Sequence, residues 1–117
     1  MTAIIFITDA ETLHATLDDS PYAREFAAML PLEMELSDYH GVEKVADLPH
    51  KLDTSAAPTS YEPAIGDITT YAPWGNLALF YQPFSSSRGL VRLGEFDAAS
   101  RSKLTTLEGR VRIEVAE

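Results

Sequence analysis

Cysteine is absent from this 117-residue sequence, and the absence removes several kinds of chemistry at once. No disulfide can form, no thiolate can act as a nucleophile, and no cysteine-based zinc site can exist. Three histidines are present, His14, His40 and His50, but none is spaced to share a metal ion with a second histidine or a nearby carboxylate on one face. We therefore expect no metal and no cofactor.

Positive charge and long apolar runs are also scarce. Nine Lys and Arg residues stand against 18 Asp and Glu residues, which gives a formal net charge of −9. Such a chain repels a phosphate backbone and an anionic lipid surface, so we expect neither nucleic acid nor a membrane as partner. The first apolar run ends at Thr8 and has no positive residues before it, unlike a signal peptide or a membrane span. We expect a cytoplasmic protein.

Apolar residues are plentiful enough for one packed domain. They make up 45% of the chain, and 117 residues is a usual length for a single domain, so we expect one domain over residues 1–117. Alternation of apolar and polar residues predicts strands, which we place at residues 2–8, 11–17, 32–36, 42–48, 68–71, 77–81, 89–96 and 110–115. The segments 50–63 and 83–89 are rich in Ser and Pro and are predicted to be loops.

Two segments carry the signals of a helix start. Ser20 precedes a proline and an apolar stripe, which predicts a helix over residues 20–30. Asp97 is placed to cap a second helix over residues 98–107. Eight short strands and two short helices, without alternation of strand and helix, predict a mainly β fold. The spacing is that of a closed antiparallel barrel.

The stretch GDITTYAPWGNLALFYQ, residues 66–82, is the part around which the chain is organised. It holds four aromatic residues, including the only tryptophan, Trp74. Large aromatic side chains beside a strand corner pack in a core or line a shallow pocket, so we expect Tyr71, Trp74 and Tyr81 to contribute to both. Asn76 either caps the turn or joins that wall. Arg88, a cation in the next loop, either holds a ligand carboxylate or carbonyl, or pairs with a surface aspartate.

Three blocks of the sequence resemble the small bacterial cyclophilin-like domain proteins. They are SPYAREFAAMLPLEMELSDYHG, YAPWGNLALFY and SRGLVRLGEF, and with their flanks they cover nearly the whole chain. The resemblance implies an eight-stranded cyclophilin-like barrel with two helices capping its ends.

True cyclophilins are peptidyl-prolyl isomerases that use an arginine in a Phe-His-Arg sequence beside a proline pocket. The matching region here, residues 43–49, is EKVADLP and lacks that sequence, so the resemblance implies the fold and no catalytic residue. Lys44 lies on this strand, but we expect Val45 to face the barrel interior and Lys44 to face away. We therefore expect no isomerisation at a cyclophilin-like rate.

The favoured hypothesis is a binding module without catalysis. A peptide or small ligand would lie in a groove beside the aromatic corner, and the candidate ligand-binding residues are Tyr71, Trp74, Asn76, Tyr81 and Arg88. The oligomeric state stays open.

Two enzyme hypotheses stand beside it. In the first, the protein is a peptidyl-prolyl isomerase in which Arg88 replaces the missing arginine. In the second, Glu43 and Asp47, four residues apart on one strand face, act on small acidic or sugar substrates.

Overall fold

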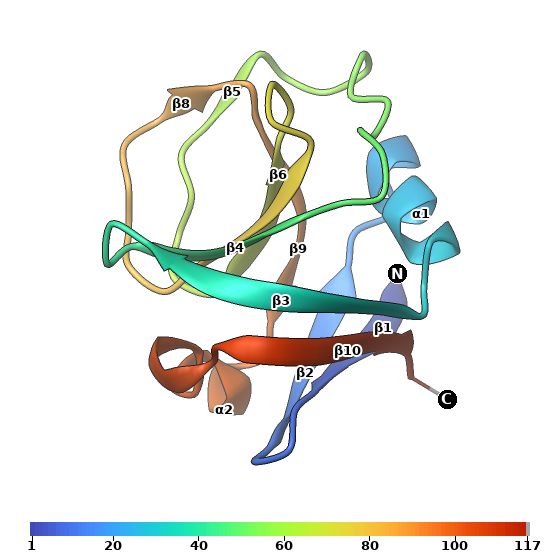
Figure 1. Cartoon of the computed structure of the whole chain (residues 1–117). Helices are drawn as coiled ribbons and strands as arrows, with labels where there is room; N and C mark the ends of the chain where they lie inside the picture. The colour runs from blue at the N-terminus through green and yellow to red at the C-terminus, as the bar shows by residue number, and fades with distance from the viewer. Residues whose placement is uncertain (117) are drawn as a thin grey trace.

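A closed barrel of eight antiparallel strands forms the centre of the computed structural model, which describes residues 1–116 (Figure 1). The barrel strands are β1 (Thr2–Ile7), β2 (Thr12–Leu17), β3 (Leu32–Tyr39), β4 (Glu43–Asp47), β6 (Asp67–Tyr71), β7 (Asn76–Phe80), β9 (Leu90–Phe96) and β10 (Gly109–Val115). Around the barrel they follow the order β1-β10-β3-β4-β7-β6-β9-β2. The predicted mainly β barrel is confirmed.

The first helix, α1 (Pro21–Ala28), begins where the sequence predicts it. The Ser20 hydroxyl accepts a hydrogen bond from the Ala23 backbone N–H at 3.2 Å, and Pro21 occupies the first turn. A proline loses nothing there, because the first backbone N–H groups of a helix have no partner inside it. The helix is closed by Met29 as its C-terminal cap.

The prediction of one continuous helix over residues 98–107 is wrong. The chain forms a single short helix, α2 (Ala98–Arg101), and then a 3-10 turn, η1 (Leu104–Thr106). Asp97 caps α2 as expected, since its carboxylate accepts from the Ser100 N–H at 2.8 Å. Hydroxyl side chains then bond to nearby carbonyls, Ser102 to Ala99 and Thr106 to Lys103. Such local bonds compete with the helical ladder and explain why the segment breaks.

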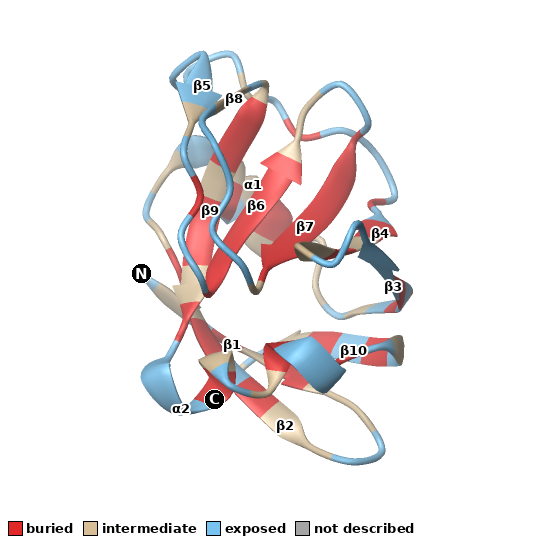
Figure 2. Ribbon diagram, turned by 90° about the vertical axis from the view of Figure 1, so that its left-hand side faces the viewer, coloured by how far each residue is buried: buried red, intermediate tan, exposed pale blue. Residues whose placement is uncertain are grey.

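The two predicted loops each contain a two-residue strand. They are β5 (Ser60–Tyr61) and β8 (Ser87–Arg88), and they pair with each other in a separate antiparallel sheet. In Figure 2 the segments next to this small sheet cross in front of β6 and β9. The outer face of that side of the barrel is therefore partly covered by the chain itself.

The apolar side chains form two clusters, one on each side of the sheet. The larger fills the barrel and includes Phe26 of α1 and Leu104 of η1, so the helical segments close its two ends. The smaller lies on the outer face and consists of Ala78, Phe80 and Leu90. Partly buried residues of β4, β5 and β6 pack against this second cluster. This outer cluster is the floor on which the candidate site is built.

The prediction that Val45 faces the interior and Lys44 faces away is wrong. Strand β4 pairs with β7 so that Lys44 lies opposite the core residue Leu79, while Val45 lies opposite Ala78 of the outer cluster. Lys44 is therefore only 4% exposed. Its Nζ lies 3.5 Å from Asp38 Oδ1 and 5.1 Å from the centre of the Tyr81 ring. These contacts compensate a buried cation that its own strand leaves inside the barrel.

None of the helices within residues 1–116 has the length and apolar character needed to cross a lipid bilayer.

Candidate functional site

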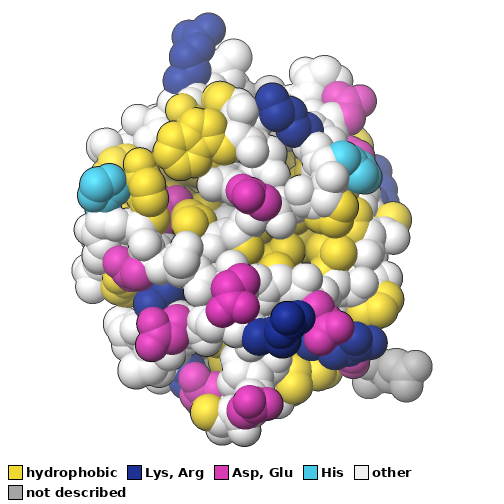
Figure 3. Space-filling view, in the orientation of Figure 1, with side chains coloured by type: hydrophobic (Ala, Val, Ile, Leu, Met, Phe, Trp, Pro, Cys, Tyr) yellow, Lys and Arg dark blue, Asp and Glu magenta, His cyan; other side chains and the backbone are white. Residues whose placement is uncertain are grey.

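A cavity of about 250 Å³ lies on the outer face of the barrel, above the smaller apolar cluster. We call it the aromatic cavity, and its lining residues are Tyr39, Glu43, Tyr71, Trp74, Asn76, Phe80, Phe84, Ser87 and Leu90. They come from β3, β4, β6, β7, β9, the β6–β7 turn and the segment around β8. Figure 3 shows hydrophobic side chains gathered at the upper left of the molecule, near the β3–β4 turn.

The tight β6–β7 turn determines where Trp74 lies. The backbone N–H groups of Trp74 and Gly75 both donate to the Tyr71 carbonyl at 3.0 Å. Gly75 has a φ of 62°, a conformation that residues with a Cβ rarely adopt. The Asn76 side chain accepts from the Tyr71 N–H at 3.1 Å and so closes the turn from its other end. The turn therefore holds the indole ring outside the barrel core.

Three aromatic rings pack edge to face at the cavity. Trp74 lies between Tyr71, at 5.3 Å between ring centres, and Tyr39, at 5.7 Å, and both interplanar angles are 84°. Trp74 is nevertheless 57% exposed, Phe84 is 47% exposed and Tyr39 is 37% exposed. Neighbouring exposed aromatic residues of this size are typical of a binding surface rather than of a core.

Glu43 is the one charged residue among those that line the aromatic cavity. It is half-buried, and this burial raises the pKa of its carboxyl group. Within the described residues 1–116, its carboxylate takes part in no ion pair. The next residue, Lys44, extends to the opposite side of the sheet and pairs with Asp38.

The structure brings together three of the five predicted ligand-binding residues. Tyr71, Trp74 and Asn76 line the aromatic cavity, whereas Tyr81 and Arg88 do not. The Tyr81 ring packs on the barrel core, and its hydroxyl donates to Asp38, which raises the pKa of Tyr81. Arg88 is exposed on β8, where it pairs in register with a serine of β5.

Several lining residues were absent from the sequence-based site. Phe84 offered a signal, because it is an aromatic residue in an otherwise polar loop. Leu90 offered none, since it joins the cavity only because β9 pairs with β6, whereas Tyr39 is placed opposite Glu43 by the short β3–β4 hairpin. Glu43 was considered with Asp47, and both do lie on the outer face of β4. Asp47 is exposed and does not line the cavity, so no pair of carboxylates forms there.

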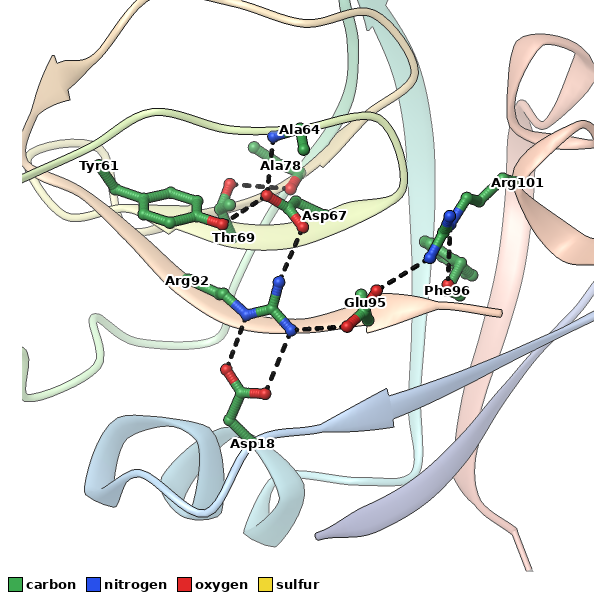
Figure 4. A network of polar contacts seen from close by, with 10 residues as sticks. All are labelled: Asp18, Tyr61, Ala64, Asp67, Thr69, Ala78, Arg92, Glu95, Phe96 and Arg101. Carbon is green, nitrogen blue, oxygen red and sulfur yellow. Dashed lines mark hydrogen bonds and ion pairs between the residues drawn. The ribbon is translucent and has the colours of Figure 1, made fainter. Parts of the chain in front are cut away.

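A second hollow, of about 260 Å³, lies beside a network centred on Arg92 (Figure 4). We call Arg92 with Asp18, Asp67 and Glu95 the Arg92 cluster. The guanidinium Nε lies 2.9 Å from Asp18 Oδ2, Nη1 lies 2.9 Å from Asp67 Oδ1, and Nη2 lies 3.1 Å from Glu95 Oε1. The hydrogen bond with Asp18 is the main cause of the raised pKa of Arg92. Four of the five guanidinium N–H donors have an acceptor in Asp18, Asp67 or Glu95, so the cluster links parts of the fold and is largely satisfied without a ligand.

The acidic partners in the Arg92 cluster are themselves well satisfied. Asp67, only 3% exposed, also accepts from the Tyr61 hydroxyl at 2.6 Å and from the Ala64 N–H at 2.8 Å. Glu95 is held from its other side by Arg101, at 2.9 Å. The charges of the Arg92 cluster are therefore already paired within the fold.

Over residues 1–116, no three His, Asp or Glu side chains gather as a group able to hold a metal ion. The chemistry of the aromatic cavity is that of its rings and one carboxylate.

Comparison with known proteins identifies one family. A model described as the cyclophilin-like family matches residues 6–116, a range that includes every lining residue of the aromatic cavity. No curated protein matches the sequence.

Proposed function

Because the chain belongs to the cyclophilin-like family, we propose that it is a non-catalytic binding module that holds a peptide or small ligand in the aromatic cavity. The observation that carries the proposal is Trp74, which is exposed and yet fixed between two tyrosine rings at a surface cavity. Tyr71, Trp74 and Asn76 are the predicted contact residues that remain at this site. Tyr81 and Arg88 stay outside it.

The hydrophobic effect gives little reason for so exposed a ring. An apolar ring that faces water gains little from the hydrophobic effect, which is proportional to the area removed from water. A bound group would cover the rings and recover that free energy. The cavity volume of about 250 Å³ is slightly below the range of roughly 300–1,000 Å³ typical of sites for drug-sized molecules. It therefore suits a single side chain or a small chemical group.

The electrostatics of the cavity favour binding over prolyl isomerisation. The barrier to rotation about a peptide bond is roughly 18–20 kcal/mol, and lowering it needs a group that stabilises the twisted amide. Lys44 extends into the barrel and pairs with Asp38, while Arg88 does not line the cavity. Among the described residues, the cavity contains aromatic rings and an anion where an isomerase of this fold would need a cation.

The single tryptophan makes the proposal directly testable. A panel of short peptides and fragments is titrated while indole fluorescence and amide NMR shifts are recorded. We expect the Trp74 indole signal to move first, together with the amides of the β6–β7 turn. In Trp74→Ala these amide shifts should disappear while the protein stays folded. Shifts confined to the Arg92 cluster, or ligand binding that survives in Trp74→Ala, would contradict the proposal.

A further inference from the structure

The charge of the aromatic cavity limits what it can bind. Glu43 contributes a carboxylate, and the eight other lining residues are neutral. The whole chain has a formal net charge of −9, so an anionic ligand would be repelled both locally and at long range. Partial burial strengthens the interaction of this carboxylate with any cation that enters the cavity, because the local dielectric constant is lower than in water.

The aromatic rings favour the same sign of charge. The face of an aromatic ring is the negative part of its quadrupole, so it attracts a cation placed within about 6 Å of its centre. Trp74, the best of the aromatic residues for this interaction, lies with two tyrosines and two phenylalanines in the lining. Aromatic rings and a carboxylate are the kinds of group that proteins use to recognise ammonium groups.

The hydrogen-bonding capacity of the cavity narrows the type of cation. Asn76 already accepts from the Tyr71 N–H, and the Ser87 hydroxyl donates to the Ser85 carbonyl at 3.1 Å. Glu43 is the one charged acceptor among the lining residues. A primary ammonium has three N–H donors and is a compact, strongly hydrated charge, so it covers little of the exposed aromatic surface. An alkylated ammonium has fewer donors or none, and its apolar surface can cover the exposed rings.

We infer that the aromatic cavity binds an alkylated ammonium group, with its charge beside the Glu43 carboxylate and its alkyl groups against Trp74 and the neighbouring tyrosines. The group belongs to a small molecule or to an alkylated amine on a peptide side chain; the binding chemistry is the same. This inference rests on the proposed binding function and names its ligand class.

A pair of molecules with the same shape tests the charge directly. Choline contains a trimethylammonium group, and 3,3-dimethyl-1-butanol replaces its nitrogen by carbon and is neutral. Both are titrated against the full chain with Trp74 fluorescence and NMR shifts as readouts. We expect choline to bind at least about tenfold more tightly, as cation–π attraction and the carboxylate act on it alone. Equal affinities would overturn the inference and would leave the proposed binding function intact.

Two charge-removing variants of β4 distinguish a local contact from a general attraction. Glu43→Gln should reduce choline affinity but leave it above that of the neutral molecule, because the cation–π attraction of the rings remains. Asp47→Asn removes the same charge from the same strand face outside the cavity, and should change choline affinity by less than about twofold. Equal losses in the two variants would mean that choline responds only to net charge, and this would overturn the inference. Circular dichroism of both variants checks that the barrel is folded.

A further comparison separates the sources of the ammonium group. Peptides that carry either lysine or trimethyllysine at one position are titrated beside choline. Preference for the trimethylated peptide over both its lysine form and choline supports the inference with a peptide as the source. Similar affinity for choline and the trimethylated peptide supports it with a free small molecule as the source. If neither binds but other peptides move the Trp74 signal, the inference is wrong and the binding function stands. If nothing moves that signal, both are wrong.

Discussion

Two surface hollows of this barrel have nearly the same volume but different chemistry. Beside the Arg92 cluster, a guanidinium is bound by Asp18, Asp67 and Glu95, and each charge has its partner. In the aromatic cavity, Glu43 has no cation among the described residues, and Trp74 is left partly in water. The comparison teaches that volume does not distinguish a structural hollow from a candidate binding site. The difference lies in whether the polar and aromatic groups are already satisfied by the fold.

The largest effect on stability is expected from a substitution in the Arg92 cluster, where the charges are paired. Arg92→Ala would leave Asp67 buried with its charge uncompensated, and should lower the free energy of unfolding by on the order of 3 kcal/mol. Urea denaturation measures the loss. Arg88→Ala is the matched control, because Arg88 is exposed on β8 and should change stability by less than about 0.5 kcal/mol. Equal stability of the two variants would show that the Arg92 cluster does not hold the fold together.

Trp74→Ala, in the aromatic cavity, should abolish ligand binding but lower the free energy of unfolding only slightly. Removal of a fully buried tryptophan costs about 3–5 kcal/mol, whereas a ring that is 57% exposed should cost about 1 kcal/mol or less. Binding at the aromatic cavity should be lost in the same variant. A denaturation midpoint that falls as far as that of a core substitution such as Phe96→Ala would place Trp74 with the core instead.

Glu43→Gln should stabilise the protein slightly at neutral pH. Burial raises the pKa of Glu43, so the folded state binds the Glu43 proton more tightly than the unfolded state does. The free energy of unfolding of the wild type therefore falls as the pH rises from the unfolded-state pKa of Glu43 through its folded-state pKa. The variant avoids the cost of the desolvated carboxylate. The gain should be less than about 1 kcal/mol, because solvent screens a half-exposed group. Below pH of about 4, where Glu43 is protonated in both states, the gain should disappear. Melts at both pH values test this, and a loss of stability at pH 7 would mean that Glu43 has a stabilising partner.

We expect the protein to show no catalysis in a prolyl isomerase assay. A protease-coupled assay with a prolyl peptide should show the uncatalysed rate, since the described lining of the aromatic cavity contains no Lys or Arg. Clear catalysis that disappears in Arg88→Ala would restore the isomerase hypothesis. Catalysis retained in Arg88→Ala would point to a group outside the proposed site.

The local parts of this structure follow from neighbouring residues and were predictable. The capping role of Ser20 and the Tyr71–Asn76 corner need only residues within a few positions of each other. The break after α2 is also local, but it depends on which hydroxyl side chains bond to the backbone. Helix propensity does not include the competition between these side-chain hydrogen bonds and the helical backbone bonds. One continuous helix was therefore predicted over residues 98–107.

The aromatic cavity was predictable only in part, because half of its chemistry comes from distant strands. Tyr71 and Trp74 belong to one turn, and their contact at the cavity follows from that turn. Glu43 joins them only because β4 pairs with β7, and a shift by one residue would place Lys44 there instead. Alternation along EKVAD does not reveal the register, so sequence reasoning placed Lys44 on the wrong face.

Sequence by itself determined that this chain forms a mainly β barrel of the cyclophilin-like type, with an acidic surface and an aromatic corner. The β barrel, the acidic surface and the aromatic corner rest on composition, alternation and local turn chemistry, whereas the cyclophilin-like type rests on the resemblance of three sequence blocks. Tertiary structure alone decided which charges are satisfied. Arg92 meets Asp18 across 74 positions and Asp67 across 25, while Glu43 meets no cation in the described chain. Electrostatic pairing depends on distance in space, and only closure of the barrel sets those distances.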